Sequence, residues 1–292
     1  VSVLRDGRHV GTVPAAEADE DRIVQMMIGR RLGEYFPEHL GHAHGEPILE
    51  VEGLSSPGRF RDVSFSMRPG EVLGLAGLVG SGRSEVAEAI FGLDPAATGR
   101  VSISGRPARI KSPRDAIRRR LGLVPEDRKR AGLVLSMDAR ANLTLPVLGD
   151  LSTLGWIHAP RERALVEEYF DRLRVRASGP EAPAGALSGG NQQKLVLARW
   201  LAARCDVLLL DEPTRGVDVG AKAEIHELIA RLACDGAAIL LISSELPEVL
   251  NLSTRVLVLR AGRVVTDLDR EQADQERVLR FMTGLDAGSD VA

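Results

Sequence analysis

The chain of 292 residues has no long apolar run, and stretches such as 207–210 and 237–242 are among its longest. A membrane helix needs about 20 consecutive apolar residues, so we expect none here. Two cysteines, Cys205 and Cys234, are too few for a disulfide framework or a four-ligand zinc site. We therefore expect a reducing, cytoplasmic setting, and no secretion leader is evident at the start.

Aromatic residues are scarce, with two Trp, two Tyr and six Phe, and the formal net charge is only -3. Proteins that bind nucleic acid usually carry a basic surface or aromatic stacking platforms, so we predict no nucleic-acid partner. The chain is 44% hydrophobic and 27% charged, which is ordinary for a folded globular protein. Glycine is plentiful at 30 residues, and several glycines gather in two short strings, at 77–82 and 189–190.

An internal repeat relates residues 1–30 to residues 256–285, which align without a gap. Each copy reads as a strand, a glycine turn, a second strand and a short helix. The second copy closes a module that begins near residue 46. We therefore expect the first copy to be the tail of a preceding module, so that the chain is a piece of a tandem protein. Matching pairs include Val3 and Val258, Leu4 and Leu259, Gly7 and Gly262, Met27 and Met282, and Gly29 and Gly284.

Residues 35–47 are rich in proline, glycine and histidine and form the expected linker between the two modules. His39, His42 and His44 could form a metal clip. No thiolate lies nearby and no regular helix would bring the rings together, so we favour a solvated linker. Residues 286–292 are expected to be a flexible tail.

The second module, residues 48–285, alternates strands with helices. Residues 48–52 and 63–67 alternate like exposed strands, whereas 71–76, 121–124, 206–210 and 237–242 are short apolar runs typical of a parallel sheet. Helices are predicted from Ser112 and Pro113, and over 161–175 and 219–234. We predict an α/β fold with a mainly parallel core, antiparallel strands at its start, and a helical insertion over about 131–187.

The string GLVGSGRS at 77–84 follows a predicted strand and opens a helix. It fits the phosphate-binding pattern G-x-x-x-x-G-K-[ST], with arginine in place of lysine. Its backbone N–H groups and the following helix would bind phosphate, and the Ser84 hydroxyl would bind Mg²⁺. Arginine keeps the charge but changes the geometry, so we expect weakened nucleotide binding and poor hydrolysis. The candidate nucleotide-binding residues are Gly77, Gly80, Ser81, Gly82, Arg83, Ser84 and Glu85.

Two acids, Asp211 and Glu212, end the apolar run at 207–210. At the carboxyl end of a strand beside the phosphate loop, Asp211 can bind Mg²⁺ through water and Glu212 can polarise the attacking water. A second candidate phosphate surface is the string LSGGNQQK at 187–194. Ser188 is a good helix cap, and Gly189 and Gly190 leave N–H groups bare at the positive end of the helix. If it sits on the insertion, this surface can reach only a nucleotide held by another module.

The string LSGGNQQK, followed by an apolar strand and Asp-Glu-Pro-Thr, resembles the signature and Walker B motifs of ATP-binding-cassette (ABC) proteins. Over residues 46–285 and the tail 1–34, the chain resembles the second cassette of tandem ATPases of bacterial importers of ribose, xylose and galactose type. The narrower likeness is carried by VPEDRK at 124–129, EPTRGVD at 212–218 and SSELPE at 243–248.

The resemblance implies a P-loop nucleotide-hydrolase fold, ATP and Mg²⁺ as cofactors, and ATP hydrolysis that drives sugar uptake. It also implies integral membrane permease subunits, a sugar-binding protein outside the membrane, and a place on the inner face of the plasma membrane. By the same resemblance, Asp218 is the acid of the D-loop. Ser188, Gly189, Gly190, Asn191 and Gln193 would face a nucleotide held by the preceding cassette.

Three residues depart from the family pattern. Glu126 stands where a glutamine usually contacts Mg²⁺ and water, Ser244 stands where a histidine contacts the terminal phosphate, and Arg83 replaces lysine. The catalytic residues would be Glu212, Ser244 and Glu126, and since two of these depart from the pattern we expect impaired hydrolysis at this site. Asp211, Glu212, Asp218 and the signature keep the pattern, so we expect the signature to complete a competent site on the first cassette. Phe60 could stack on adenine, but a core position is at least as plausible.

Two other functions remain open from the residues. The first is a soluble cassette ATPase that acts on nucleic acid or ribosomes, although the insertion is too short for a long coiled coil and the charge is mildly acidic. The second is a regulatory domain that binds ATP without hydrolysing it. The sequence does not identify the sugar.

Overall fold

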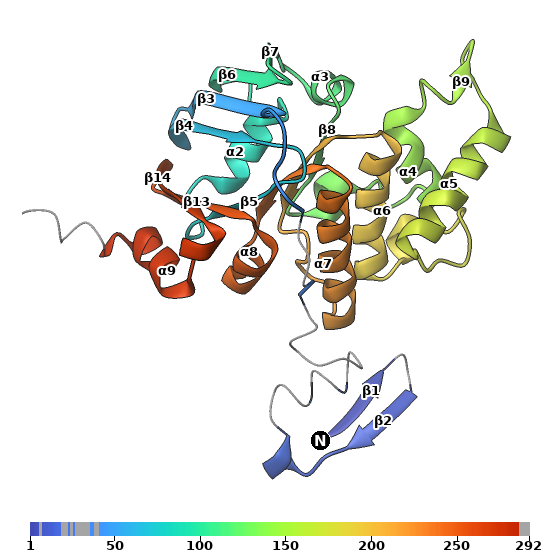
Figure 1. Ribbon diagram of the computed structural model, residues 1–292. Helices are drawn as coiled ribbons and strands as arrows, with labels where there is room; N and C mark the ends of the chain where they lie inside the picture. Colours follow the sequence, from blue (N-terminus) through green and yellow to red (C-terminus); the bar gives the residue numbers. More distant parts are fainter. Residues whose placement is uncertain (6–7, 19–22, 24–25, 27–35, 38–40, 286–292) are drawn as a thin grey trace, which may run out of the picture.

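A six-stranded sheet with the order β14-β13-β5-β12-β11-β8 forms the centre of the molecule (Figure 1). The computed structural model describes residues 1–5, 8–18, 23, 26, 36–37 and 41–285. All neighbouring strands of this sheet are parallel except β13 and β14. Strands β5, β8, β11 and β12 are buried along their length, as their apolar runs predict. The strands are β5 (Val72–Ala76), β8 (Leu121–Val124), β11 (Val207–Asp211), β12 (Ala238–Ile242), β13 (Arg255–Arg260) and β14 (Arg263–Asp269).

A second, antiparallel sheet has the order β4-β3-β6-β7. It consists of β3 (Leu49–Ser56), β4 (Phe60–Met67), β6 (Thr98–Ile103) and β7 (Arg106–Pro107). The first two strands are longer than the predicted ranges 48–52 and 63–67. Irregular pairing around Val51 and Leu54 lets the chain continue past the point where its alternation breaks. With the parallel sheet, this confirms the predicted α/β fold with antiparallel strands at its start.

Helices connect the parallel strands, as the sequence predicts. The side chain of Ser112 accepts a hydrogen bond from the Asp115 backbone at 3.3 Å, which confirms the predicted helix start. Helix α7 has the predicted bounds 219–234. The helices outside the insertion are α2 (Arg83–Ile90), α3 (Pro113–Arg118), α7 (Val219–Cys234) and α8 (Leu246–Leu252), which precede further strands, and α9 (Gln275–Thr283), which follows the last strand.

The chain between β8 and β11 is largely helical, and α4 and α5 stand apart from the central sheet in Figure 1. It contains a π-helical turn (Arg128–Gly132), α4 (Ala139–Thr144), α5 (Ala159–Leu173) and α6 (Gly189–Ala202). A short hairpin of β9 (Ser152–Thr153) and β10 (Trp156–Ile157) joins α4 to α5 and was not predicted. Two-residue strands leave too little alternation to be recognised in a sequence.

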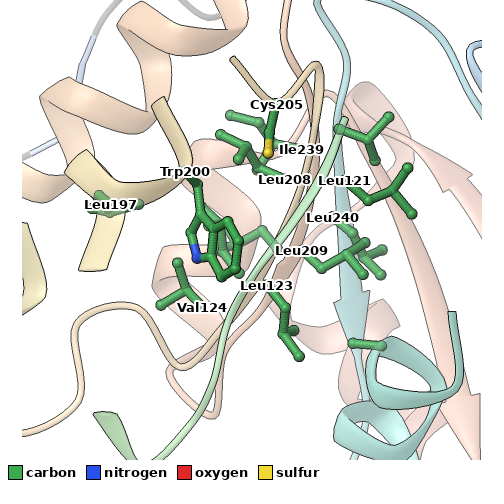
Figure 2. Close-up of a cluster of buried hydrophobic side chains, with 14 of the residues drawn as sticks. Leu121, Leu123, Val124, Leu197, Trp200, Cys205, Leu208, Leu209, Ile239 and Leu240 are labelled. Atoms are coloured by element: carbon green, nitrogen blue, oxygen red, sulfur yellow. The ribbon is translucent and has the colours of Figure 1, made fainter. Parts of the chain in front are cut away.

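Trp200 anchors α6 to the sheet, and Figure 2 shows its indole beside Leu123 and Val124 of β8. The ring also meets Phe91 edge-on, with centroids 5.7 Å apart. A Cβ on Gly122 would come within 2.8 Å of the indole, so this strand position requires glycine. This contact fixes the helix whose first turn carries the LSGG string.

Residues before the module form an antiparallel hairpin of β1 (Ser2–Arg5) and β2 (Arg8–Thr12), drawn apart from the main body in Figure 1. This hairpin corresponds to β13 and β14 in the second copy of the repeat. The helix expected after it, His39 and residues 286–292 lie largely or wholly outside the described residues.

Residues 42–46 of the linker are exposed, as expected of a solvated linker, but two other linker residues contact the module. Gly41 is buried, and a Cβ there would clash with the Gly70 carbonyl oxygen and lie 2.7 Å from Ala233. The Phe36 ring stacks on His226 of α7, with centroids 5.0 Å apart. His42 and His44 are exposed, and the described residues contain no metal-holding group of three or more His, Cys, Asp or Glu.

Candidate functional site

The loop between β5 and α2 contains three glycines at positions where a side chain would be strained or would clash. Gly80 and Gly82 have φ of 79° and 100°, a region that favours glycine. A Cβ on Gly77 would lie 2.5 Å from the Leu259 carbonyl oxygen, so this position also requires glycine. The buried hydroxyl of Ser81 has no hydrogen-bond partner among the described residues. Ser84 and Glu85 follow in the first turn of α2, where positive N–H groups favour an anion.

Arg83 points into the protein and is 8% exposed. Its Nη1 donates to the Ser243 carbonyl oxygen at 2.7 Å, which joins α2 to the end of β12. Burial lowers the pKa of this guanidinium, and the charges of Glu212 and Asp211 oppose that shift. The fork therefore makes an internal contact in addition to facing the two acids.

Asp211 ends β11 and is 4% exposed. Burial raises its pKa to about 6, against a hydrogen bond from Ser84 that favours the charged form. Its Oδ1 lacks a hydrogen-bond partner within the described part of the chain. A buried carboxylate oxygen without a partner, next to a serine hydroxyl, suits an oxygen-binding cation such as Mg²⁺. The residues present therefore fit the predicted metal site.

Glu212 has a left-handed backbone conformation, with φ of 48°. The Ser244 hydroxyl donates to its Oε2 at 3.0 Å. Burial raises the pKa of Glu212, and the hydrogen bond from Ser244 opposes this. The structure thus brings Ser244 to the carboxylate that was predicted to polarise water.

Glu126 follows β8 on the same edge of the sheet, but its carboxylate pairs with the Arg215 guanidinium. Both side chains are about half exposed, at 46% and 60%. The structure therefore places Glu126 in a surface ion pair beside the D-loop, and no motif in the sequence indicates this contact.

The LSGG turn begins α6, and its residues differ in exposure. Ser188 is exposed and its hydroxyl accepts a hydrogen bond from the Asn191 backbone at 3.4 Å, as predicted for a cap. Gly189 is half-buried, while Gly190 is buried against Ala221. Asn191 uses its Oδ1 to accept from the Arg176 backbone at 2.8 Å. Gln193 is only 2% exposed, so its side chain lies inside the protein and away from the surface of the turn.

The D-loop follows Glu212 and leads into α7. Asp218 caps that helix, because its Oδ1 accepts from the Ala221 backbone at 3.0 Å. Since Gly190 packs on the same Ala221, the D-loop and the LSGG turn lie side by side on one face.

Two buried polar residues of this region escaped the sequence reasoning. Glu248 of α8 is 1% exposed and accepts hydrogen bonds from Thr214 at 2.6 Å and Ser243 at 2.8 Å, and lies 3.0 Å from His226 Nε2. Arg128 is 8% exposed and reaches the D-loop. Both lie in strings that carry the family likeness, SSELPE and VPEDRK, which was the available signal.

Phe60 is 4% exposed and belongs to the core, so the core alternative is confirmed over stacking on adenine. Next to it, the turn between β3 and β4 lines an open hollow of about 430 Å³ with Ser56, Arg59 and Thr98 among its walls. The Arg59 carbonyl oxygen would lie 3.0 Å from a Cβ on Gly82, so this hollow adjoins the phosphate-type loop.

Comparison with known proteins agrees with this geometry. Residues 60–215 match the ABC transporter family. The chain is 53% identical over 284 residues to the ribose import ATP-binding protein RbsA of Geobacillus kaustophilus, and 49% identical over 286 residues to that of Halalkalibacterium halodurans. These alignments cover 97% and 98% of the chain but 57% of each relative, so the chain spans little more than half their length.

Solved structures show the same fold. A nucleotide-free ATP-binding cassette from an ABC transporter has a TM-score of 0.67 at 24% identity, covering 80% of this chain and 95% of that one. The cassette MJ0796 in a dimeric post-hydrolysis state with ADP and Pi has a TM-score of 0.65 at 22% identity, covering 76% and 98%. A search of the described helices finds none long and apolar enough to cross a bilayer. The fold, the motif geometry and the family match together show that the chain belongs to the ABC transporter family.

Proposed function

We propose that this chain is the ATP-binding and hydrolysing part of an importer for a monosaccharide of the ribose type. The observation that carries the proposal is the meeting of the glycine loop, Ser84 and Asp211 at the carboxyl edge of the parallel sheet, where Asp211 Oδ1 has no partner among the described residues. The ribose assignment is supported by relatives that are named for ribose import.

Each residue of the site has a distinct role. The N–H groups of residues 77–84 bind phosphate oxygens, and Ser84 and Asp211 would hold Mg²⁺. The metal would neutralise charge on the phosphates when bound. Glu212 accepts hydrogen bonds from water at the end of β11, where its raised pKa makes it a better base.

Hydrolysis at this site is impaired in our proposal, since three side chains have other partners. Arg83 donates to the Ser243 carbonyl, Ser244 donates to Glu212, and Glu126 pairs with Arg215. Each of these groups would have to leave its partner to contact a terminal phosphate or its water. Nucleotide binding depends chiefly on the backbone of the loop and is retained.

The productive site is formed in trans. The exposed Ser188 and half-buried Gly189, beside Asp218, present helix N–H groups to a nucleotide held by a preceding cassette, of which residues 1–34 are the tail. The module, residues 48–285 with its insertion at about 131–187, then transmits closure to integral membrane permease subunits. Those subunits receive sugar from a binding protein outside the membrane, and the chain itself lies on the inner membrane face.

Uptake of labelled ribose by cells that carry the full-length gene tests the proposal. Asp211→Asn should weaken binding of fluorescent ATP with Mg²⁺ by about tenfold or more, because it removes the carboxylate charge available to the metal, and should lower ribose uptake. Asp206→Asn is the matched control, because the Asp206 side chain lies at the surface in an ion pair with Arg120. If Asp211→Asn weakens nucleotide binding but leaves ribose uptake unchanged, the assignment to ribose import is wrong.

A further inference from the structure

Arg128 follows β8 in the string VPEDRK and crosses to two other segments. Its Nη1 donates to the Arg215 carbonyl oxygen at 2.5 Å, and its Nη2 donates to the Gly216 carbonyl oxygen at 3.0 Å. Its Nε donates to Oε1 of Gln192 in α6 at 3.3 Å. One planar guanidinium therefore holds the D-loop and the signature helix at the same time.

The environment of this side chain is unusual for a charge. Arg128 is 8% exposed, and its three hydrogen-bond partners are neutral oxygens. Burial accordingly lowers its pKa, although arginine stays protonated. A buried charge with neutral partners is costly to the fold, and hydrogen bonds from a charged donor offset that cost only when their geometry is held. The arrangement calls for a role beyond packing.

The two segments that Arg128 joins touch each other closely. A Cβ on Gly189 would lie 2.7 Å from the Gly216 carbonyl oxygen and 2.9 Å from Arg128 Nη2. A Cβ on Gly190 would lie 2.5 Å from the Ala221 methyl group. The first turn of α6 therefore rests directly on the D-loop, and the glycines are required within this chain as well as for any ligand.

Two further ties strengthen the same junction. Gln192 also donates from Nε2 to the Ala184 carbonyl oxygen at 3.1 Å, which fixes the turn that leads into Ser188. Lys194, further along α6, pairs with Glu224 of α7. The contacts run along the helix side that faces the D-loop and α7.

We propose that Arg128 is a positioning residue that locks the signature turn to the D-loop, so that both are presented to a partner nucleotide as one rigid surface. This rests on the proposed function, in which that surface completes a site in trans. Because the guanidinium donates hydrogen bonds to the carbonyl oxygens of residues 215 and 216, it fixes the position of Asp218 relative to Ser188 and Gly189. Without it, each segment can adjust alone, and their joint fit to one nucleotide is lost.

The test uses the full-length protein and compares ATP turnover with the affinity for fluorescent ATP. Arg128→Gln should lower kcat by about tenfold, since hydrogen bonds from a charged donor are lost, and should leave affinity at the P-loop within about twofold. The kcat of Arg128→Lys, which keeps the charge but not the planar guanidinium, should lie between the kcat of Arg128→Gln and that of the unaltered protein. Added guanidinium ion should partly restore turnover to Arg128→Ala. The matched control is Arg130→Gln, in the same turn but exposed.

Each outcome decides the proposal. A folded Arg128→Gln protein with full turnover overturns it, as does an equal loss of turnover and affinity with no rescue. If Arg128→Gln does not fold, Gln192→Met provides the test instead. It removes the hydrogen bond between Arg128 and Gln192, and the Arg128 guanidinium keeps its bonds to the carbonyl oxygens of residues 215 and 216. For Gln192→Met, a loss of kcat smaller than about tenfold, with unchanged affinity for ATP, supports the proposal. Unchanged turnover overturns it. If Gly189→Asp leaves turnover intact, the function in trans fails, whatever Arg128 does.

Discussion

Arg83 shows how a single side chain can change the contacts of a glycine loop, here the loop that we propose binds phosphate. The loop keeps its glycines, yet the fork at its end donates to the Ser243 carbonyl oxygen at 2.7 Å. Lysine has a compact ammonium on a flexible stem and would leave that carbonyl free to find another donor. The Arg83 side chain is therefore less available to bind phosphate, because it links α2 to the end of β12 instead.

Arg83→Lys should therefore bind ATP more tightly. We expect a gain of about three- to tenfold, because a charge-assisted bond to the protein no longer competes with phosphate. Titration of the purified protein with fluorescent ATP in the presence of Mg²⁺ measures it. Arg100→Lys, outside the loop and in an exposed ion pair with Glu52, serves as the control. Equal affinity in Arg83→Lys and the unaltered protein would show that the fork does not compete.

Glu248 is a second residue whose effect depends on its environment. Burial opposes its charge, but hydrogen bonds from His226, Thr214 and Ser243 dominate and lower its pKa below the ordinary 4.5. A carboxyl group whose pKa is lower in the folded protein stabilises the fold above its unfolded pKa, and that stabilisation is lost as the pH falls through the folded value.

Glu248→Gln should therefore lower the free energy of unfolding by about 3 kcal/mol near neutral pH, where the buried carboxylate is charged. The difference from the unaltered protein should stay nearly constant from about pH 7 to about pH 5, and shrink between about pH 5 and about pH 3 as the pH falls through the lowered folded pKa. Urea unfolding across that range gives both values. Glu245→Gln, whose exposed side chain pairs with Lys222, should change stability little at any pH. A pH-independent difference would contradict the charged state of Glu248.

At the scale of elements, the position of α6 depends on a strand-to-helix contact. Trp200 lies over Gly122 of β8, and its ring meets the Phe91 ring edge-on. Because the signature turn is at the other end of this helix, a shift at Trp200 would move the turn as well.

Gly122→Ala should overpack this contact, since its Cβ would lie 2.8 Å from the indole. We expect a loss of about 1–3 kcal/mol in the free energy of unfolding. Thermal or urea unfolding followed by tryptophan fluorescence measures it. Gly149→Ala is matched, because nothing lies within 4 Å of a Cβ there. Equal stability of the two variants would mean that α6 can shift without lowering the free energy of unfolding.

Element by element, the sequence predicted well wherever one local signal sufficed. Continuous apolar runs identified the buried strands, and the Ser112 cap and the 219–234 periodicity identified two helices. It failed where structure depends on distant partners. The docking of Gly41 against Gly70 and Ala233 follows from shape, which composition does not reveal, and the short β9–β10 hairpin leaves no periodicity.

Over the whole molecule, the candidate site shows the same division. The strings that form the phosphate loop, the Asp211–Glu212 pair and the LSGG turn could be read directly, since each is contiguous. Arg128 and Arg215, and His226 and Glu248, are separated by 87 and 22 residues, and only folding brings them together. Such contacts could be predicted only with knowledge of the sheet order.

The proposed completion of a site in trans predicts an effect on ATP turnover of the full-length protein. Two variants at Gly189 separate this effect from changes within the chain itself. Gly189→Asp should abolish most ATP turnover of the full-length protein, because a carboxylate would repel phosphate at the positive end of α6. Any side chain at this position also presses on Gly216, so part of the effect is internal. Gly189→Ala carries that steric part without the charge. We therefore expect turnover to fall further in Gly189→Asp than in Gly189→Ala, by about tenfold or more, while affinity for fluorescent ATP stays equal. If the two variants have the same turnover, the signature turn acts only through its own chain and completes no other site.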